Sequence, residues 1–298
     1  MHSATRQRSV IGTLLAACLI GGLTLSGCTA AEPAPTSTTP RTAAPAATSA
    51  AEAVPPLPPA LGPAAIAALP AAVYNAVIPG LLAAPAELRF TAADTVSADA
   101  PLYGADFSTP VARVPARDFL GAPTVVVPVA AKGGWSLVLT ASRQVLPSHA
   151  PAGTVAPAQT AAWLPTSALR PLNDLPARIV LSLSAQTLTI TDASGATLQS
   201  FPAGVGAPGT PTPTGTTGYL QARYFDPAQG QTTHRIQLTS LHSTAADEPY
   251  GGSDGGLIGV HYEEVASGAV SHGCIRLSAA ALAAVDGLPL GTPISIAE

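Results

Sequence analysis

Short apolar runs separated by turn residues fill the C-terminal part of the chain. Residues 178–183 (Arg-Ile-Val-Leu-Ser-Leu) and 187–191 (Thr-Leu-Thr-Ile-Thr) are of strand length, and only Ser184-Ala185-Gln186 separates them. This pattern predicts a pair of neighbouring strands. The turn residues 192–195 (Asp-Ala-Ser-Gly) then lead into a further strand at 197–201.

A helix and a last strand are predicted near the end of the sequence. Ser278 precedes the Ala-rich run 279–285, and a serine in this place can cap a helix through its side-chain oxygen. Residues 292–296 return as a strand. We therefore assign residues 173–298 to one β domain, in which residues 204–215 (Gly-Val-Gly-Ala-Pro-Gly-Thr-Pro-Thr-Pro-Thr-Gly) form a rigid loop.

A second β region precedes this domain. Residues 124–129 and 135–139 are strand-like, with the turn Lys132-Gly133-Gly134 between them, and a further strand is predicted at 159–165 (Gln-Thr-Ala-Ala-Trp-Leu-Pro). The order of these segments resembles the small SH3-like β-barrels of bacterial cell-wall proteins. The resemblance implies that residues 87–172 are either a wall-binding module or a spacer that positions the next domain.

The residues before this region are apolar or rich in alanine and proline. Residues 61–86 contain four prolines and predict short helices around 64–69 and 71–78. Residues 28–60 are almost entirely Ala, Pro, Thr and Ser. Such a segment cannot bury enough apolar surface to fold, so it predicts a disordered and extended linker.

The first residues have the pattern of an export signal. Two arginines precede an apolar run over 10–25, which is shorter than a membrane-spanning helix needs. The run ends in Leu-Ser-Gly-Cys at 25–28, which resembles the lipobox of bacterial lipoproteins. The resemblance implies that residues 1–27 are a lipoprotein signal peptide and that Cys28 carries acyl chains such as palmitate. The exported protein would then be anchored to the outer face of the cytoplasmic membrane.

Composition narrows the class of protein. Aromatic residues make up 4% and charged residues 10% of the chain, which contains 27 glycines and 31 prolines. This composition favours a turn-rich, mainly β protein over a helical bundle. The formal net charge is -4. A nucleic-acid-binding protein would be expected to show a basic stripe, so no nucleic-acid partner is predicted.

The cysteines point to one reactive thiol. Of the three, Cys18 and Cys28 lie in or at the end of the export signal, which leaves Cys274 without a disulfide partner. A lone thiol in an exported protein is more often reactive than structural.

Cys274 lies in the sequence Ser-His-Gly-Cys-Ile-Arg-Leu, residues 271–277, which contains the other groups that thiol chemistry needs. A histidine base produces the thiolate, and backbone N–H groups can hold the oxyanion. Gly273 allows a turn or a close approach of the substrate. Two histidines are candidate bases. His272 would share a face with Cys274 in an extended strand, and His261 lies further upstream.

Three ordered pieces of the C-terminal domain resemble the YkuD-type catalytic domain of L,D-transpeptidases. They are the strand pair ending at 187–190, the loop 206–215, and the run Ile258-Gly259-Val260-His261 followed by residues 271–277. The resemblance implies a catalytic β-sandwich with Cys274 as the nucleophile and His261 as the general base and acid. It also implies oxyanion donors in the backbone of residues 272–274.

The same resemblance marks further site residues. Ser271, His272 and Arg276 match motif positions around the thiol, and Arg276 either binds a substrate carboxylate or bonds structurally to loop carbonyls. Tyr262 stands where the family usually has a small residue, in the loop that shapes the acceptor side. His242 is predicted to be a surface or lid histidine rather than a catalytic one. These histidines and Cys274 lack the paired spacing of zinc motifs, so no metal and no cofactor is predicted.

The implied partners are peptidoglycan stem peptides. A tetrapeptide donor would acylate Cys274, and the amine of an acceptor stem would resolve the acyl-enzyme into a 3→3 cross-link during cell-wall biogenesis. Carbapenems would acylate the same thiol. Two alternatives remain open, namely an L,D-carboxypeptidase on the same scaffold and a non-catalytic wall-binding lipoprotein.

Overall fold

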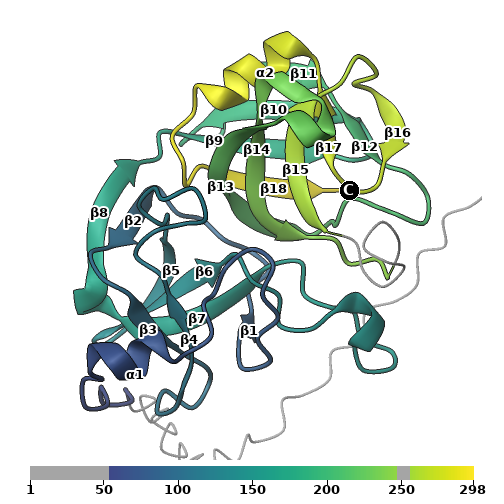
Figure 1. Cartoon of the computed structure of the whole chain (residues 1–298). Coiled ribbons are helices and arrows are strands. Elements are labelled where there is room, and N and C mark those ends of the chain that lie inside the picture. Colours follow the sequence, from purple (N-terminus) through teal and green to yellow (C-terminus); the bar gives the residue numbers. More distant parts are fainter. Residues whose placement is uncertain (1–53, 247–255) are drawn as a thin grey trace, which may run out of the picture. The chain divides into compact units, whose positions relative to one another are not determined.

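A computed structural model describes residues 54–246 and 256–298 (Figure 1). The predictions for the signal peptide, for Cys28 and for most of the linker lie outside these residues. The described residues belong to one compact unit. Within them, no helix is long and apolar enough to cross a membrane.

The N-terminal domain is mainly β, as the sequence predicts. Its elements are α1 (Pro63–Ala67), β1 (Leu82–Ala83), β2 (Ala92–Val96), β3 (Ala100–Tyr103), β4 (Pro110–Val114), β5 (Val127–Lys132), β6 (Trp135–Thr140), η1 (Pro147–His149), β7 (Thr160–Pro165), η2 (Thr166–Ala168) and β8 (Leu169–Asp174). Strands β4, β3, β7, β6 and β5 form a sheet in this order, β1 adds to β7, and β2 pairs with β8. Gly133 has a φ of 60° in the tight turn between β5 and β6, which glycine adopts readily.

The segment before β1 is less helical than the sequence predicts. The first expected helix forms as α1, but the second, expected at 71–78, is wrong. Ala71 forms a bridge with Arg113 and Val77 a bridge with Arg143, so this stretch pairs with the sheet instead. Prolines flank it at both ends and disfavour a helix. Two of its side chains, Ala72 and Ile78, join the core of the N-terminal domain, where Ile78 is 3% exposed.

One residue near the end of the predicted linker bonds to the N-terminal domain. The indole N–H of Trp135, a fully buried side chain, donates to the carbonyl oxygen of Pro55 at 3.0 Å. The end of the predicted linker therefore contacts the N-terminal domain at Pro55.

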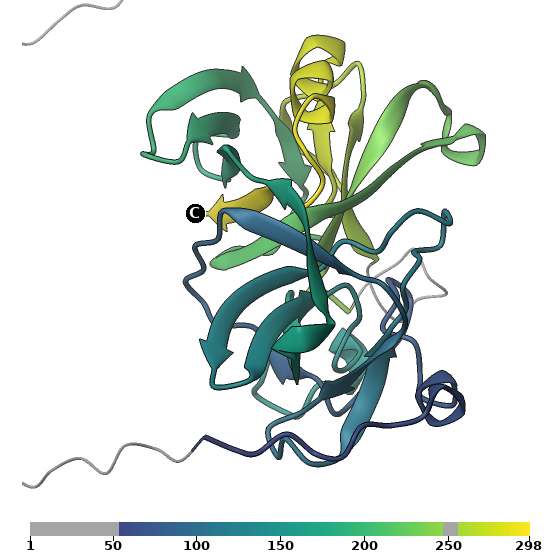
Figure 2. The same ribbon diagram turned by 90° about the vertical axis from the view of Figure 1, so that its left-hand side faces the viewer.

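The described residues of the C-terminal domain form a ten-stranded sheet and one α-helix. Its elements are β9 (Ala177–Ser182), β10 (Thr187–Asp192), β11 (Thr197–Pro202), β12 (Gly204–Gly206), β13 (Thr216–Asp226), η3 (Pro227–Gln229), β14 (Gln231–His242), β15 (Leu257–Tyr262), β16 (Gly268–Ser271), β17 (Ile275–Leu277), α2 (Ala279–Asp286) and β18 (Pro293–Ala297). The sheet order is β11-β10-β9-β18-β13-β14-β15-β17-β12-β16. The long hairpin of β13 and β14 (green in Figure 2) has η3 at its tip.

The predicted local elements of this domain are confirmed. Strands β9 and β10 form an antiparallel hairpin in which Leu188 faces Leu181. The Ser278 side chain caps α2 by accepting the Ala281 N–H at 3.4 Å. Helix α2 packs on β14, β15 and β17 and buries Leu282 and Val285 in the domain core.

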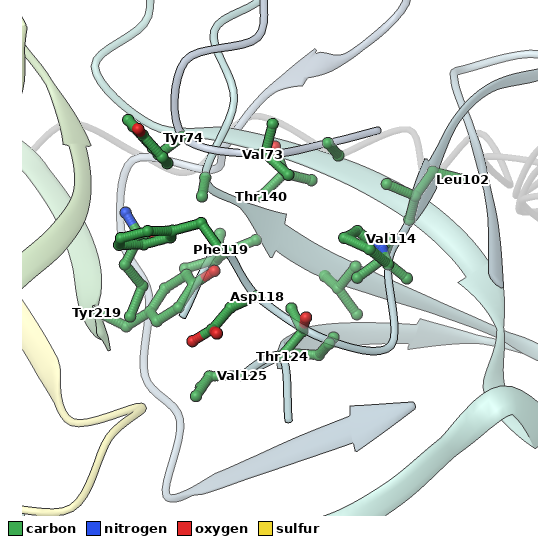
Figure 3. A pocket seen from close by; sticks show the side chains of 17 residues that line it. Val73, Tyr74, Leu102, Val114, Asp118, Phe119, Thr124, Val125, Thr140 and Tyr219 are labelled. Carbon is green, nitrogen blue, oxygen red and sulfur yellow. The ribbon is translucent and has the colours of Figure 1, made fainter. Parts of the chain in front are cut away.

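A small apolar cavity is separate from the reactive thiol. Its volume is about 40 Å³, and Figure 3 shows residues that line it, among them Tyr74, Phe119 and Tyr219. A space of this size holds little more than water. The cavity that matters for chemistry is larger and lies beside β15.

Candidate active site

Strand β15 brings His261 beside the thiol through its period of two. Leu257, Gly259 and His261 line a cavity of about 600 Å³ that Cys274 also lines. The alternate residues Ile258 and Val260 are buried in the core on the other face. Strand β17, which follows Cys274, pairs in parallel with β15, and His261 lies opposite Arg276. Long-range pairing therefore places the candidate base and the candidate nucleophile in one cavity.

The turn before Cys274 is fixed by its own hydrogen bonds. Ser271 Oγ donates to the carbonyl oxygen of Cys274 at 2.5 Å and accepts the N–H of Gly273 at 3.2 Å. Gly273 has a φ of 106°, which a residue with a side chain rarely adopts. One of the three expected oxyanion donors, the Gly273 N–H, is thus already engaged by Ser271.

The conformation of this turn argues against His272 as the base. Residues 272–274 are not a strand, so His272 and Cys274 do not alternate as an extended segment would require. His272 is exposed and is not among the residues that line the cavity with Cys274. The geometry favours His261.

The glycine- and proline-rich loop supports the same turn. Thr212, which is 2% exposed, donates its hydroxyl to the carbonyl oxygen of Gly273 at 2.8 Å and accepts the N–H of Gly206 at 2.9 Å. Thr210 donates to the carbonyl oxygen of Ser271 at 3.1 Å. The threonines of this loop are therefore hydrogen-bonding partners of the nucleophile's turn.

We expect Thr212→Val to destabilise the protein and to misplace the thiol. Valine has nearly the same shape but leaves Gly206 N–H and Gly273 C=O without their partner, which costs about 1–3 kcal/mol. Urea denaturation measures this loss, and the rate of Cys274 acylation should fall about tenfold. Thr189→Val is the matched control, because Thr189 bonds only Ser200 on the surface. If Thr212→Val left both the unfolding free energy and the acylation rate unchanged, this would contradict a role of Thr212 in supporting the turn before Cys274.

The thiol of Cys274 is protonated in its resting state. Burial raises its pKa, while a backbone hydrogen bond from Gly259 and the positive charge of Arg276 act in the opposite direction. Sγ donates to the carbonyl oxygen of Leu257 at 3.8 Å. Gly259 leaves the space beside Sγ open, since a Cβ there would lie 3.8 Å from the sulfur. The thiol needs a base to react at neutral pH.

His261 has the tautomer that a base requires. Its Nδ1 lies 3.3 Å from the carbonyl oxygen of Tyr262, which can only accept, so Nδ1 carries the proton and Nε2 keeps its lone pair. Burial lowers the pKa of His261, and the charge of Arg276 lowers it further. The Tyr262 hydrogen bond and Glu263 partly oppose this shift. The imidazole is therefore neutral at pH 7.

Glu263 is a site residue that sequence reasoning missed. Its Oε1 lies 3.5 Å from His261 Nδ1, so it faces the nitrogen that orients the ring. The signal in the sequence was an acid two residues after a candidate base, which would share its face if the strand continued. In the structure, β15 ends at Tyr262.

The remaining predicted residues take different positions. The Tyr262 ring lies tilted against His234, at 4.7 Å between ring centroids, and packs against the core rather than lining the cavity. Arg276 lies close enough to influence the pKa of both His261 and Cys274. Among the described residues, its buried Nε has no hydrogen-bond partner.

The prediction of a surface or lid position for His242 is wrong. The side chain is 2% exposed, and its Nε2 donates to the carbonyl oxygen of Ala141 at 2.8 Å. Burial, reinforced by the nearby charge of Arg143, lowers the pKa of His242 to about 3. His242 is a neutral, buried hydrogen-bonding residue.

Comparison with protein families finds one match for this domain. Residues 176–296 match the YkuD family, the L,D-transpeptidase catalytic domain. The C-terminal domain is thus similar to the YkuD domain, over less than half of the chain. No curated protein matches the chain. The matched residues include every catalytic residue predicted above, namely Cys274, His261 and His272.

Solved structures of L,D-transpeptidases are similar to the chain at low identity. L,D-transpeptidase 1 of Mycobacterium tuberculosis is 20% identical, with 47% of this chain and 78% of that chain covered and a TM-score of 0.31. An L,D-transpeptidase of Mycobacterium smegmatis is also 20% identical, with 59% and 92% covered and a TM-score of 0.33. L,D-transpeptidase 3 of M. tuberculosis, in complex with a faropenem-derived adduct, is 16% identical, with 59% and 91% covered and a TM-score of 0.33.

Proposed function

We propose that the protein is a peptidoglycan L,D-transpeptidase that forms 3→3 cross-links through an acyl-enzyme on Cys274. One observation carries the proposal: His261, with Nε2 unprotonated, lines the same cavity as Cys274. The YkuD match supports the substrate class. No cofactor is needed for this chemistry.

In the first half-reaction, His261 takes one proton from the thiol and later gives one proton to the leaving amine. His261 Nε2 takes the thiol proton as Sγ attacks the carbonyl carbon of the third stem residue, a diamino acid such as meso-diaminopimelate. A tetrahedral oxyanion forms, and nearby backbone N–H groups stabilise it. The C–N bond to the terminal D-Ala then breaks, and His261 returns the proton to the leaving amine. The product is a thioester on Cys274.

The second half-reaction resolves the thioester. The side-chain amine of an acceptor stem attacks the same carbonyl carbon, His261 accepts its proton, and the thiolate leaves and is reprotonated. Water in place of the amine would give hydrolysis. The positive charge of Arg276, which acts on both His261 and Cys274, suits the carboxylate of a stem peptide. Carbapenems would acylate Cys274 by the same route.

The test is incubation of the full chain with purified disaccharide-tetrapeptide, followed by mass spectrometry of products and protein. We expect a cross-linked dimer with loss of D-Ala, and no dimer with Cys274→Ala. Tripeptide without dimer would indicate an L,D-carboxypeptidase. No product and no acyl adduct on Cys274 would overturn the enzymatic proposal and favour a wall-binding lipoprotein.

We also propose that Cys28 is lipid-modified and anchors the exported protein to the membrane. The Leu-Ser-Gly-Cys sequence at 25–28 and the preceding apolar run support this. Cys28→Ala should move the protein from the membrane fraction to the soluble fraction. A wild-type protein that fractionates as soluble would contradict the anchor.

A further inference from the structure

The cavity around the thiol has one wall that the YkuD domain does not supply. On the catalytic side it is lined by Cys274, His261 and residues of β14 and β15. On the other side the lining residues come from the N-terminal domain: Tyr74, Asn75, Val77, Arg143 and Leu146. A substrate bound at the thiol therefore contacts two domains.

Arg143 joins this wall to the backbone beside the thiol. Its own N–H donates to the carbonyl oxygen of Ala76 at 2.9 Å, and its carbonyl oxygen accepts the Ile78 N–H at 2.9 Å. Its guanidinium donates from Nη1 to the carbonyl oxygen of Ser243 at 2.9 Å and from Nη2 to that of Gly256 at 3.4 Å. The residue is 5% exposed. A buried guanidinium is retained only when carbonyl or carboxylate partners satisfy it.

The carbonyl groups that Arg143 holds lie next to the nucleophile. Ser243 N–H donates to the carbonyl oxygen of Gly256 at 2.9 Å, so the two segments meet at this point. The next residue, Leu257, accepts the Cys274 thiol through its carbonyl oxygen. A displacement of Gly256 would therefore also move the Leu257 carbonyl oxygen, which accepts the hydrogen bond from Cys274 Sγ.

Further buried contacts fix the wall in place. His242 donates to Ala141, and Ser240 Oγ donates to Gln159 Oε1 at 2.5 Å. Two aromatic contacts add to them. The Tyr74 and Phe119 rings lie 4.8 Å apart, and Phe119 packs edge-on against Tyr224 at 5.6 Å. Tyr74 and Tyr224 line the cavity from the N-terminal and the C-terminal domain, respectively. Phe119 contacts both rings and so connects the two sides of the cavity.

We propose that the N-terminal domain is part of the substrate-binding site, with residues 74–77 binding the peptide stem and Arg143 acting as a positioning residue. The inference rests on the proposed transpeptidase function. Tyr74 and Val77 offer apolar contact, and the side-chain amide of Asn75 can pair with a peptide group. The domain then acts at the thiol itself, and not as a remote wall-binding module or a passive spacer.

The first test separates positioning from folding. Full-length Arg143→Met is compared with Arg113→Met, in which another partly buried arginine of the same domain loses its ion pair with Asp99, at 2.7 Å. Both are assayed well below their melting temperatures. We expect Arg143→Met to lower kcat for cross-linking about tenfold or more, because a small misplacement of reacting groups is costly. Arg113→Met should stay within about twofold of wild type.

Chemical rescue makes the test specific. Arg143 lines the cavity, so methylguanidinium can reach the space left in Arg143→Ala, and it should restore at least part of the lost rate. It should not affect Arg113→Ala. Equal losses in the two methionine variants, or no rescue of Arg143→Ala at any methylguanidinium concentration that leaves wild type active, would overturn the positioning role.

The second test addresses the binding wall. Asn75→Ala should raise KM for the tetrapeptide several-fold and leave the alkylation rate of Cys274 by iodoacetamide unchanged, since this reagent is too small to use the wall. An unchanged KM would overturn the role of residues 74–77. A wild-type protein without product or acyl adduct would instead contradict the proposed function, so the two failures are distinguishable.

Discussion

Replacing His261 with glutamine should slow the acylation of Cys274 by about 100-fold or more, the range expected for loss of a general base. Glutamine can still donate toward the carbonyl oxygen of Tyr262, but it cannot take the thiol proton. Because burial raises the pKa of Cys274, little thiolate forms without a base at neutral pH. The measurement is the rate of carbapenem adduct formation, followed by the mass of the protein.

The pH dependence identifies which histidine acts. His261 must be neutral to accept the proton, and its pKa lies below the ordinary value of 6.5. The wild-type rate should therefore hold down to pH 6.5 and decline only as the pH falls below it. His261→Gln should lose this acid limb, whereas His272→Gln, which changes an exposed side chain, should keep it. A flat profile in His272→Gln with a retained limb in His261→Gln would make His272 the base.

Acid should destabilise the protein through His242. Its pKa is about 3 in the folded protein and 6.5 when exposed. Between these pH values the unfolded chain binds a proton at His242 and the folded protein does not. The stability is fully present above pH 6.5 and is lost as the pH falls toward 3. Between pH 7 and pH 4.5 the loss from this residue is roughly 3 kcal/mol, at 1.36 kcal/mol per pH unit.

Urea denaturation at the two pH values measures this loss. His242→Gln is the matched variant, because its amide can still donate to the carbonyl oxygen of Ala141 but does not titrate. We expect the difference in unfolding free energy between pH 7 and pH 4.5 to shrink by most of that amount. His261 also has a lowered pKa and should account for part of the remainder. Equal pH dependence in wild type and variant would rule out the role of His242.

Local elements of the C-terminal domain could be read from the sequence because their causes are local. The hairpin of β9 and β10 follows from two strand-like runs with a short turn, and the start of α2 follows from the Ser278 cap. The prediction of a second helix at 71–78 was wrong because the conformation of this segment has a long-range cause. Its backbone pairs with Arg113 and Arg143, and such tertiary pairing overrides helix propensity.

The candidate site was predicted in part. Cys274 and His261 were identified from residue type, spacing and a family resemblance, and the cavity contains both. Glu263 and the supporting threonines were missed, because a sequence does not show which hydroxyl faces which carbonyl. The exposed position of His272 also could not be foreseen, since it depends on the positive φ of Gly273.

The sequence by itself determined the class of this protein: a mainly β chain whose residues 176–296 match the YkuD family, with Cys274 and His261 as the candidate nucleophile and base. Only the tertiary structure decided how that site is completed. Arg143 and Ser243 lie 100 residues apart, yet a hydrogen bond joins them beside the nucleophile. Short-range patterns encode strands, turns and caps, whereas a cavity wall forms only when distant segments pack, and no local pattern records that contact.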